Sequence, residues 1–323
     1  MCEKILSVTS DLIQRMMVPR LESSRKGDNG IVLVVGGSGI YHGAPLLSSL
    51  SALRSGVDLV YTAIPKSIVV ALRSFSPDII ALPFSNDEFT IASAKHVLKM
   101  LPKKPDIVAI GMGMNITKPS ALIFIIKELK KIGSKLLLDA SALIPEVLED
   151  ISGTNTIVTP HLGEYKRLFQ KAYDHNKAVN ATTATASLKE QALNVYNVAK
   201  KYGITIILKG YYNIICSGGY IHEQPQQKRI AVIKRTTPAM TVGGCGDVLS
   251  GVVAGLHTKI SDAFSASITG VYFTGLAGDL AHQKVGLHMV ATDLIEELPN
   301  AMKPFDQIIS KPEPSAAKTL YDL

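Results

Sequence analysis

Short runs of aliphatic residues alternate with helical patterns along most of this chain. Each run is continuously apolar, which is typical of strands covered by helices on both faces. Strand–helix alternation of this kind predicts an α/β fold with a mainly parallel central sheet. The predicted strands are residues 31–35, 58–63, 107–110, 135–138, 156–159 and 204–208, and the predicted helices include 45–55, 119–132 and 188–202.

The length of 323 residues accommodates one large α/β domain or two small ones. With 46% hydrophobic and 19% charged residues, the composition is that of a soluble protein with a sizeable core. The longest candidate for a membrane span, 263–278, is rich in small residues and is interpreted as a buried core helix. Without a repeat or a low-complexity linker, residues 1–323 are expected to form a single domain, with a loose tail at 303–323.

The charge and cysteine content narrow the function classes. The net charge of +7 suits a polyanionic ligand such as a nucleotide, but the basic residues are scattered and Trp is absent, so neither nucleic acid nor membrane is an expected partner. Cys2, Cys216 and Cys245 have no metal-binding spacing and form no disulfide framework. The N-terminus lacks the apolar core of a secretion signal, so a cytoplasmic location is expected.

The pattern changes between residues 211 and 232, where an antiparallel hairpin is predicted. Its strands would be 213–216 and 220–222, joined by a turn at 217–219. The polar stretch 174–187 is interpreted as a surface loop or a helix start, and helices resume after residue 233.

The segment 241–251, TVGGCGDVLSG, carries the clearest chemical signal. Gly243, Gly244 and Gly246 allow close approach of the backbone to a ligand, and an apolar helix follows. The N–H groups and dipole of a helix start bind anions, so Gly244, Cys245 and Gly246 form a candidate anion hole. Asp247 stands beside it, where a carboxylate could remove a proton from a hydroxyl that is being phosphorylated. An ordinary glycine turn is the alternative interpretation.

Other glycine-rich or polar loops follow the predicted strands. Residues 36–39 (GGSG) follow the first strand and precede Ala44, but the third glycine and the strand-end acid of a dinucleotide-binding turn are missing. Residues 111–115 (GMGMN) follow another strand. Asp139 also ends a strand and could hold a metal, bind a hydroxyl or cap a helix.

His161 and Glu164 open a predicted helix just past a strand. Residues three apart at a helix start can face one ligand, although Glu164 could instead complete a capping box. Lys209 and Gly210 end the next strand, where the lysine could contact a phosphate. Because the carboxyl ends of parallel strands share one edge of the sheet, these loops are expected to meet there.

Taken in order, these motifs resemble the ADP/ATP-dependent NAD(P)H-hydrate dehydratases of the ribokinase-like superfamily. The resemblance covers about residues 26–298. It rests on the segments 26–30 (KGDNG), 36–45 (GGSGIYHGAP), 52–56 (ALRSG), 159–168 (TPHLGEYKRL), 209–210 (KG), 240–251 (MTVGGCGDVLSG) and 292–295 (TDLI).

The resemblance implies a ribokinase-like three-layer sandwich and a hydro-lyase that repairs nicotinamide cofactors. It would dehydrate (6S)-NADHX or NADPHX to NADH or NADPH by phosphorylating the 6-hydroxyl, with ADP or ATP as the donor and Mg²⁺ as the metal. Asp247 would be the catalytic base. The resemblance places Ala44, Gly113, His161 and Asp247 at the hydrate, places Lys209, Gly210, Tyr211, Tyr212, Asn213 and Gly246 at the nucleotide, and gives Glu164 a metal-linked role.

The chain departs from the family pattern at two loops. A Gly-Pro-Gly-Leu-Gly loop is usual where residues 111–115 stand, and Asp-Ala-Asp is usual where this chain has Asp139-Ala140-Ser141. Because about 25 residues precede the matched segment, the resemblance implies a stand-alone dehydratase. A functional partnership with a separate NAD(P)H-hydrate epimerase and a homo-oligomer are also expected.

Two other functions are compatible with the sequence. One is a kinase of the same superfamily acting on a hydroxymethylpyrimidine or hydroxyethylthiazole, which the loops at 41–45 and 161–164 fit less well. The other is a non-catalytic nucleotide-binding protein, which the intact Asp247 disfavours.

Overall fold

A nine-stranded sheet forms the centre of the computed structural model, which describes residues 5–170, 187–219 and 229–310. The strand order is β10-β9-β8-β7-β6-β5-β2-β3-β4. Strands β2 to β8 run parallel to one another, and β9 is antiparallel to both β8 and β10. The strands are β2 (Ile31–Val35), β3 (Leu59–Pro65), β4 (Ile80–Phe84), β5 (Ile107–Ile110), β6 (Lys135–Leu138), β7 (Ile157–Val158), β8 (Thr205–Leu208), β9 (Tyr212–Ser217) and β10 (Arg229–Lys234).

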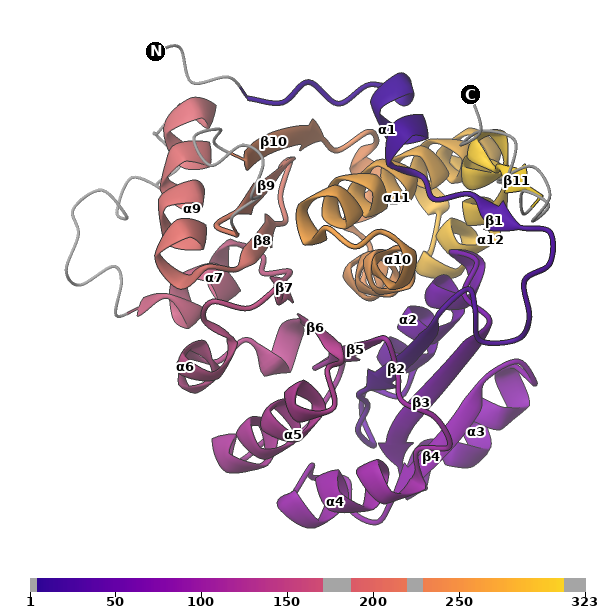
Figure 1. The fold of residues 1–323 in the computed structure, drawn as a ribbon, viewed down its shortest axis with the longest axis vertical. Helices are drawn as coiled ribbons and strands as arrows, with labels where there is room; N and C mark the ends of the chain where they lie inside the picture. Colours follow the sequence, from indigo (N-terminus) through magenta and orange to yellow (C-terminus); the bar gives the residue numbers. More distant parts are fainter. Residues whose placement is uncertain (1–4, 171–186, 220–228, 311–323) are drawn as a thin grey trace, which may run out of the picture.

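Helices cover both faces of this sheet, which gives the predicted three layers (Figure 1). One face packs against α4 (Ile91–Met100), α5 (Pro119–Lys131), α6 (Leu148–Ile151), α7 (Leu162–Leu168) and α9 (Leu188–Tyr202). The other face packs against α1 (Ser10–Met16), α2 (Gly43–Arg54), α3 (Val69–Phe75), α10 (Cys245–Lys259), α11 (Ala263–Val285) and α12 (Ala291–Met302).

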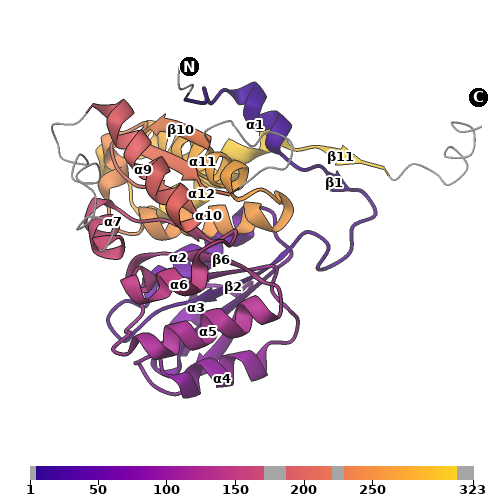
Figure 2. The same cartoon turned by 60° about the vertical axis from the view of Figure 1, so that its left-hand side comes forward.

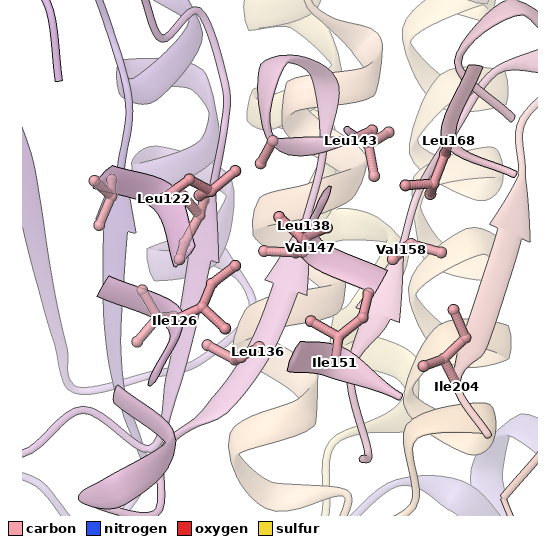
Figure 3. Close-up of a cluster of buried hydrophobic side chains, with 14 of the residues drawn as sticks. Leu122, Ile126, Leu136, Leu138, Leu143, Val147, Ile151, Val158, Leu168 and Ile204 are labelled. Carbon is pink, nitrogen blue, oxygen red and sulfur yellow. The ribbon is translucent and has the colours of Figure 1, made fainter. Parts of the chain in front are cut away.

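Successive residues of a strand pack alternately into the hydrophobic cores on the two faces of the sheet. In β6, Leu136 and Leu138 join the cluster under α5 and α6, whereas Leu137 joins the opposite cluster. Figure 3 shows the first cluster, in which Leu122 and Ile126 of α5 lie beside β6 and Ile151 lies beside Val158. Because side chains alternate across a strand, a continuously apolar run is what two covered faces require. This explains why the aliphatic runs predicted the sheet.

The structure confirms the predicted strands with small shifts at their ends, and it adds elements that were not predicted. The edge strand β4 contains Pro83, a residue tolerated mainly at sheet edges. The region predicted to be antiparallel is so, but β9 pairs with β8 and β10, and residues 220–222, its predicted partner, lie outside the described part. Most of the stretch 174–187 also lies outside it.

Two short segments from opposite parts of the chain form a second sheet, separate from the main one. Strand β1 (Arg20–Leu21) pairs in parallel with β11 (Ile308–Ile309), and Figure 2 shows the two side by side. The tail expected to be loose from residue 303 therefore begins with a 3-10 turn (Lys303–Phe305) and a paired strand, and residues 311–323 lie outside the description.

The buried helix α10 packs closely on α2 through small residues. A Cβ added to Gly251 would lie 2.1 Å from the carbonyl oxygen of Ser48, so no larger residue fits there without movement. This contact fixes the helix whose first turn carries Asp247. None of the described helices combines the length and apolar character needed to span a bilayer.

Candidate active site

The loops singled out in the sequence lie at the carboxyl edge of the parallel strands. The chain moves from β2 to β3 and β4 on one side, then crosses to β5 and continues on the other side. The strand order therefore reverses between β2 and β5, and ligands of α/β sheets bind at such a point. The two strand-end loops contact each other here, since Gly37 N–H donates to the Met112 carbonyl at 2.8 Å.

Gly113 and Ala44, both predicted to contact the hydrate, lie against each other at this crossing. Gly113 has φ of +65°, and a Cβ there would lie 3.1 Å from the Ala44 Cβ and 2.7 Å from the Tyr41 Cβ. Gly111 has φ of +121°, and its Cβ would lie 1.9 Å from the Asp139 carbonyl oxygen. The departure from the usual loop sequence thus retains glycine where the backbone demands it.

Helix α10 begins with a glycine in the left-handed conformation. Gly244 is the N-cap, with φ of 96°, and no side chain caps the helix start. The first N–H groups, from Cys245 onward, are therefore available for an anion. Asp247 lies in this first turn and is half-buried, and it makes no hydrogen bond or ion pair with another described residue.

Lys209, at the end of β8, is held by a buried carboxylate. Its Nζ lies 2.8 Å from Asp139 Oδ1 and 3.9 Å from Glu164 Oε2. Asp139 Oδ2 accepts a 2.7 Å hydrogen bond from the hydroxyl of Ser250, one turn after Asp247 on α10. Burial lowers the pKa of Lys209, but the surrounding carboxylates outweigh it and raise the pKa above its ordinary value. Lys209 is therefore a permanent cation.

The same cluster raises the pKa of Asp247 to about 7. Burial is the largest cause, and the negative charges of Asp139 and Glu164 add to it, while Lys209 opposes it. A carboxylate with a pKa near neutrality is suited to take a proton at physiological pH. Asp247 is the group in this site whose electrostatics fit a general base.

His161 and Glu164 form a capping box at the start of α7. His161 Nδ1 accepts from the N–H groups of Gly163 and Glu164, at 3.0 and 3.3 Å, and Glu164 Oε2 accepts from His161 N–H at 2.8 Å. The capping interpretation is thus confirmed. Glu164 also faces Lys209, whereas the His161 side chain is 60% exposed.

A cavity of ≈ 240 Å³ lies beside the start of α10. Four residues predicted at the nucleotide line it, namely Lys209, Gly210, Asn213 and Gly246, together with Cys245. A Cβ on Gly246 would lie 3.3 Å from Lys209 Nζ, so the glycine keeps this wall open.

Tyr211 and Tyr212, also predicted at the nucleotide, do not line the cavity. Their rings contact each other edge to face with centroids 4.9 Å apart, and Lys234 Nζ lies 5.3 Å from the Tyr211 ring centre. Both side chains are exposed, and the link of Tyr211 to the cavity is through Lys234, which lines it.

Sequence reasoning missed the opposite wall of this cavity. That wall comes from the end of β10 and from the middle of α11, with Lys234, Arg235, Thr274 and Gly275 among its residues. The small residues of 263–278 were a signal for it, because Thr and Gly leave space beside a helix. The ion pair between Asp139 and Lys209 was also missed, since it depends on the order of strands that are distant in the sequence.

Few carboxylate oxygens in the site are free to bind a divalent cation. Both oxygens of Asp139 accept hydrogen bonds from protein groups, and Glu164 Oε1 has a 3.4 Å contact with His161 Nε2. In the described ranges no group of three or more His, Cys, Asp or Glu side chains could hold a metal. Mg²⁺ commonly takes one or two carboxylates plus phosphate oxygens and water, and Glu164 fits that mode.

Comparison with known proteins agrees with this geometry. The sequence profile of the NAD(P)H-hydrate dehydratase family matches residues 32–300. The ADP-dependent (S)-NAD(P)H-hydrate dehydratase of Nitrosopumilus maritimus is 45% identical over 94% of this chain and 99% of its own length. The bifunctional NAD(P)H-hydrate repair enzyme Nnr of Pyrobaculum aerophilum is 38% identical over 88% of this chain, which spans 52% of that protein.

A solved structure confirms the fold. The ADP/ATP-dependent NAD(P)H-hydrate dehydratase of Bacillus subtilis, co-crystallised with ATP and Mg²⁺, has a TM-score of 0.72 at 22% identity over 92% of this chain and 98% of its own. The hydroxyethylthiazole kinase of Pyrococcus horikoshii has a TM-score of 0.54 at 11% identity. The vitamin-kinase alternative therefore shares the fold, but the sequence matches decide against it: this chain belongs to the NAD(P)H-hydrate dehydratase family.

Proposed function

We propose that this protein dehydrates (6S)-NADHX and NADPHX to NADH and NADPH, and that Asp247 is the base of the reaction. The observation that carries this proposal is the placement of Asp247: a half-buried carboxylate with a pKa of about 7, at an uncapped helix start beside a cavity lined by a cation. Asp247 has no hydrogen bond or ion pair with another described residue, and its pKa is about 7. Both properties favour a role in proton removal over a structural role.

The reaction would begin with transfer of a phosphoryl group to the 6-hydroxyl of the substrate. Asp247 accepts the hydroxyl proton as the oxygen attacks the terminal phosphorus of the donor, and the bond from phosphorus to the bridging oxygen breaks. The N–H groups of residues 244–246 stabilise the charge on the transferring phosphoryl. The ring nitrogen then expels phosphate from C6, and loss of a C5 proton restores the dihydronicotinamide.

The proposed donor rests on the relatives, and the proposed metal rests on Glu164. ADP is the proposed donor, because the relatives from Nitrosopumilus maritimus and Cenarchaeum symbiosum are both named ADP-dependent. Mg²⁺ would be held by Glu164 and the donor phosphates, and when bound it would neutralise phosphate charge. Lys209 and Gly246 would line the phosphate end of the nucleotide site, with Ala44, Gly113 and His161 on the hydrate side.

We also expect a homo-oligomer, a cytoplasmic location and a separate epimerase that supplies the S epimer. The large exposure of Val70 and Phe75 on α3, 75% and 69%, supports a subunit contact at this helix. Cys216 and Cys245 are free thiols, as is usual in a reducing compartment. Light scattering of the purified protein tests the oligomer directly, and a monomer at micromolar concentration contradicts it.

An assay with chemically prepared NADH hydrate tests the function. Protein, Mg²⁺ and ADP or ATP are mixed with the hydrate, and the absorbance of the NADH that forms is followed. The proposal predicts NADH formation with ADP, with AMP and phosphate as products. If folded protein yields no NADH with either nucleotide, the proposal is wrong.

A further inference from the structure

A second cavity, of ≈ 500 Å³, lies at the opposite edge of the sheet from Asp247. Its lining includes Asn29 and Gly56, which precede β2 and β3, and Lys259, the last residue of α10. Since α10 has 15 residues and an α-helix rises about 1.5 Å per residue, this cavity is about 20 Å from Asp247. Its volume is within the range of about 300–1,000 Å³ that small-molecule sites occupy.

The cavity combines an apolar floor with a basic rim. The apolar part includes Met17, Leu256, Ile260, Met302 and Phe305. The basic lining residues are Arg20, Arg54, Lys259 and Lys303, against one acidic lining residue, Asp306. A ligand that matches both halves carries an anionic group on an apolar or aromatic body.

Two of the four cations already have partners. Arg20 forms a 2.8 Å ion pair with Asp58, and Lys259 Nζ donates to Asn29 Oδ1 at 2.8 Å. The side chains of Arg54 and Lys303 form no hydrogen bond or ion pair with any residue in the described ranges. Their N–H donors therefore remain free at the rim.

The helix dipoles account for part of the clustering of basic residues here, but they do not provide hydrogen-bond acceptors for the side-chain N–H groups. Arg54 and Lys259 lie in the last turns of α2 and α10, and Lys303 is the C-cap of α12. A helix C-terminus carries roughly half a negative charge, which favours cations nearby. The dipole favours the positive charge of these side chains, but it leaves the planar guanidinium of Arg54 without a hydrogen-bond acceptor. A guanidinium is well suited to bind a phosphate or a carboxylate.

We propose that this cavity is a second ligand site, which binds an organic anion: a phosphate or carboxylate group held by Arg54 and Lys303, with an apolar body on the floor of Met302 and Phe305. The site is separate from the dehydratase centre, and the proposal stands whether or not the proposed function is correct.

Phenyl phosphate is a suitable probe, because it has one anionic group and one ring. Amide chemical shifts of the full-length protein are followed by NMR during its titration. Saturable shifts are expected at Gly56, Asn300 and Gln307, with binding weakened at least tenfold in Arg54→Glu/Lys303→Glu. Shifts confined to the surroundings of Gly246, or none at all, would overturn the proposal.

A matched control distinguishes weakened binding at a specific site from a general effect of removing positive charges at helix ends. Arg73 and Lys99 are exposed basic residues in the last turns of α3 and α4, and they do not line the cavity. Arg73→Glu/Lys99→Glu should bind the probe like the wild type. Equal weakening in both double variants, or equal binding of uncharged benzyl alcohol, contradicts the proposal. If the glutamate variant does not fold, Arg54→Gln/Lys303→Gln is measured against the same criterion.

Discussion

Lys209 Nζ lies 2.8 Å from Asp139 Oδ1, an ion pair that joins the ends of two strands separated in the sheet by β7. Through Ser250, which donates to the other oxygen of Asp139, this pair is connected to the helix that carries Asp247. The cation, the buried acid and the base are thus parts of one network, and a change in one should alter the others.

The rate should depend on the ionisation of Asp247. Its pKa is raised from 3.8 to about 7, and a general base must be deprotonated to work. We therefore expect kcat/KM with NADH hydrate to rise tenfold per pH unit below about 7 and to level off above it. A profile from pH 5 to 9 in a constant-ionic-strength buffer checks this. A rise centred near pH 4 would show that Asp247 has an ordinary pKa.

Removing the Lys209 charge should move that profile. Lys209 lowers the pKa of Asp247, so Lys209→Met is expected to shift the rise to higher pH and to weaken ADP binding at least tenfold. It should also destabilise the protein by about 3 kcal/mol, because Asp139 is left buried without its cation.

Lys234 provides the control for this substitution. It lines the same cavity but forms its contact with Tyr211 instead of the buried acids. Lys234→Met should weaken ADP binding without moving the pH profile. If both variants shift the profile equally, Lys209 has no specific effect on Asp247.

The glycine turn offers a matched pair of substitutions. A Cβ at Gly246 would lie 3.3 Å from Lys209 Nζ on the cavity wall, whereas one at Gly243 meets nothing within 4 Å. Gly246→Ala should raise the KM for ADP about tenfold, and Gly243→Ala should change it less than twofold. Steady-state kinetics measures both. Similar KM values for the two variants would place the nucleotide elsewhere.

The raised pKa also predicts an effect on stability. Folding favours the neutral form of Asp247, so its contribution is fully present below pH 3.8 and is lost as the pH rises through about 7. Asp247→Asn removes this loss and should be more stable than the wild type at pH 8, by at most about 4 kcal/mol. The difference should shrink towards pH 4, which urea unfolding at both pH values tests. A less stable variant at pH 8 would contradict the raised pKa.

The sequence predicted the layers of the fold better than the details of the site. The aliphatic runs of β2, β5 and β6 were placed at their observed bounds because burial on both faces demands uninterrupted apolar residues. Strand β4 escaped prediction because Pro83 and partly exposed positions interrupt its pattern. The partner strand of β9 was misplaced because its distance along the chain is not fixed by local turn signals.

Local sequence patterns identified the loops of the site, but they could not show which loops contact each other. Asp247, Gly246 and Lys209 were identified because each follows a strand or opens a helix. The bond between Asp139 and Lys209 depends on the sheet order, and the contribution of Thr274 and Gly275 depends on which face of α11 meets the cavity. Neither relationship is encoded in a short segment of sequence.

The most direct test of the central claim is the turnover of Asp247→Asn. With NADH hydrate, Mg²⁺ and ADP at pH 8, the variant should lose at least a thousandfold in kcat, since the base is gone, while calorimetry should find ADP affinity within about threefold of the wild type. Retention of wild-type turnover would show that Asp247 is not the base.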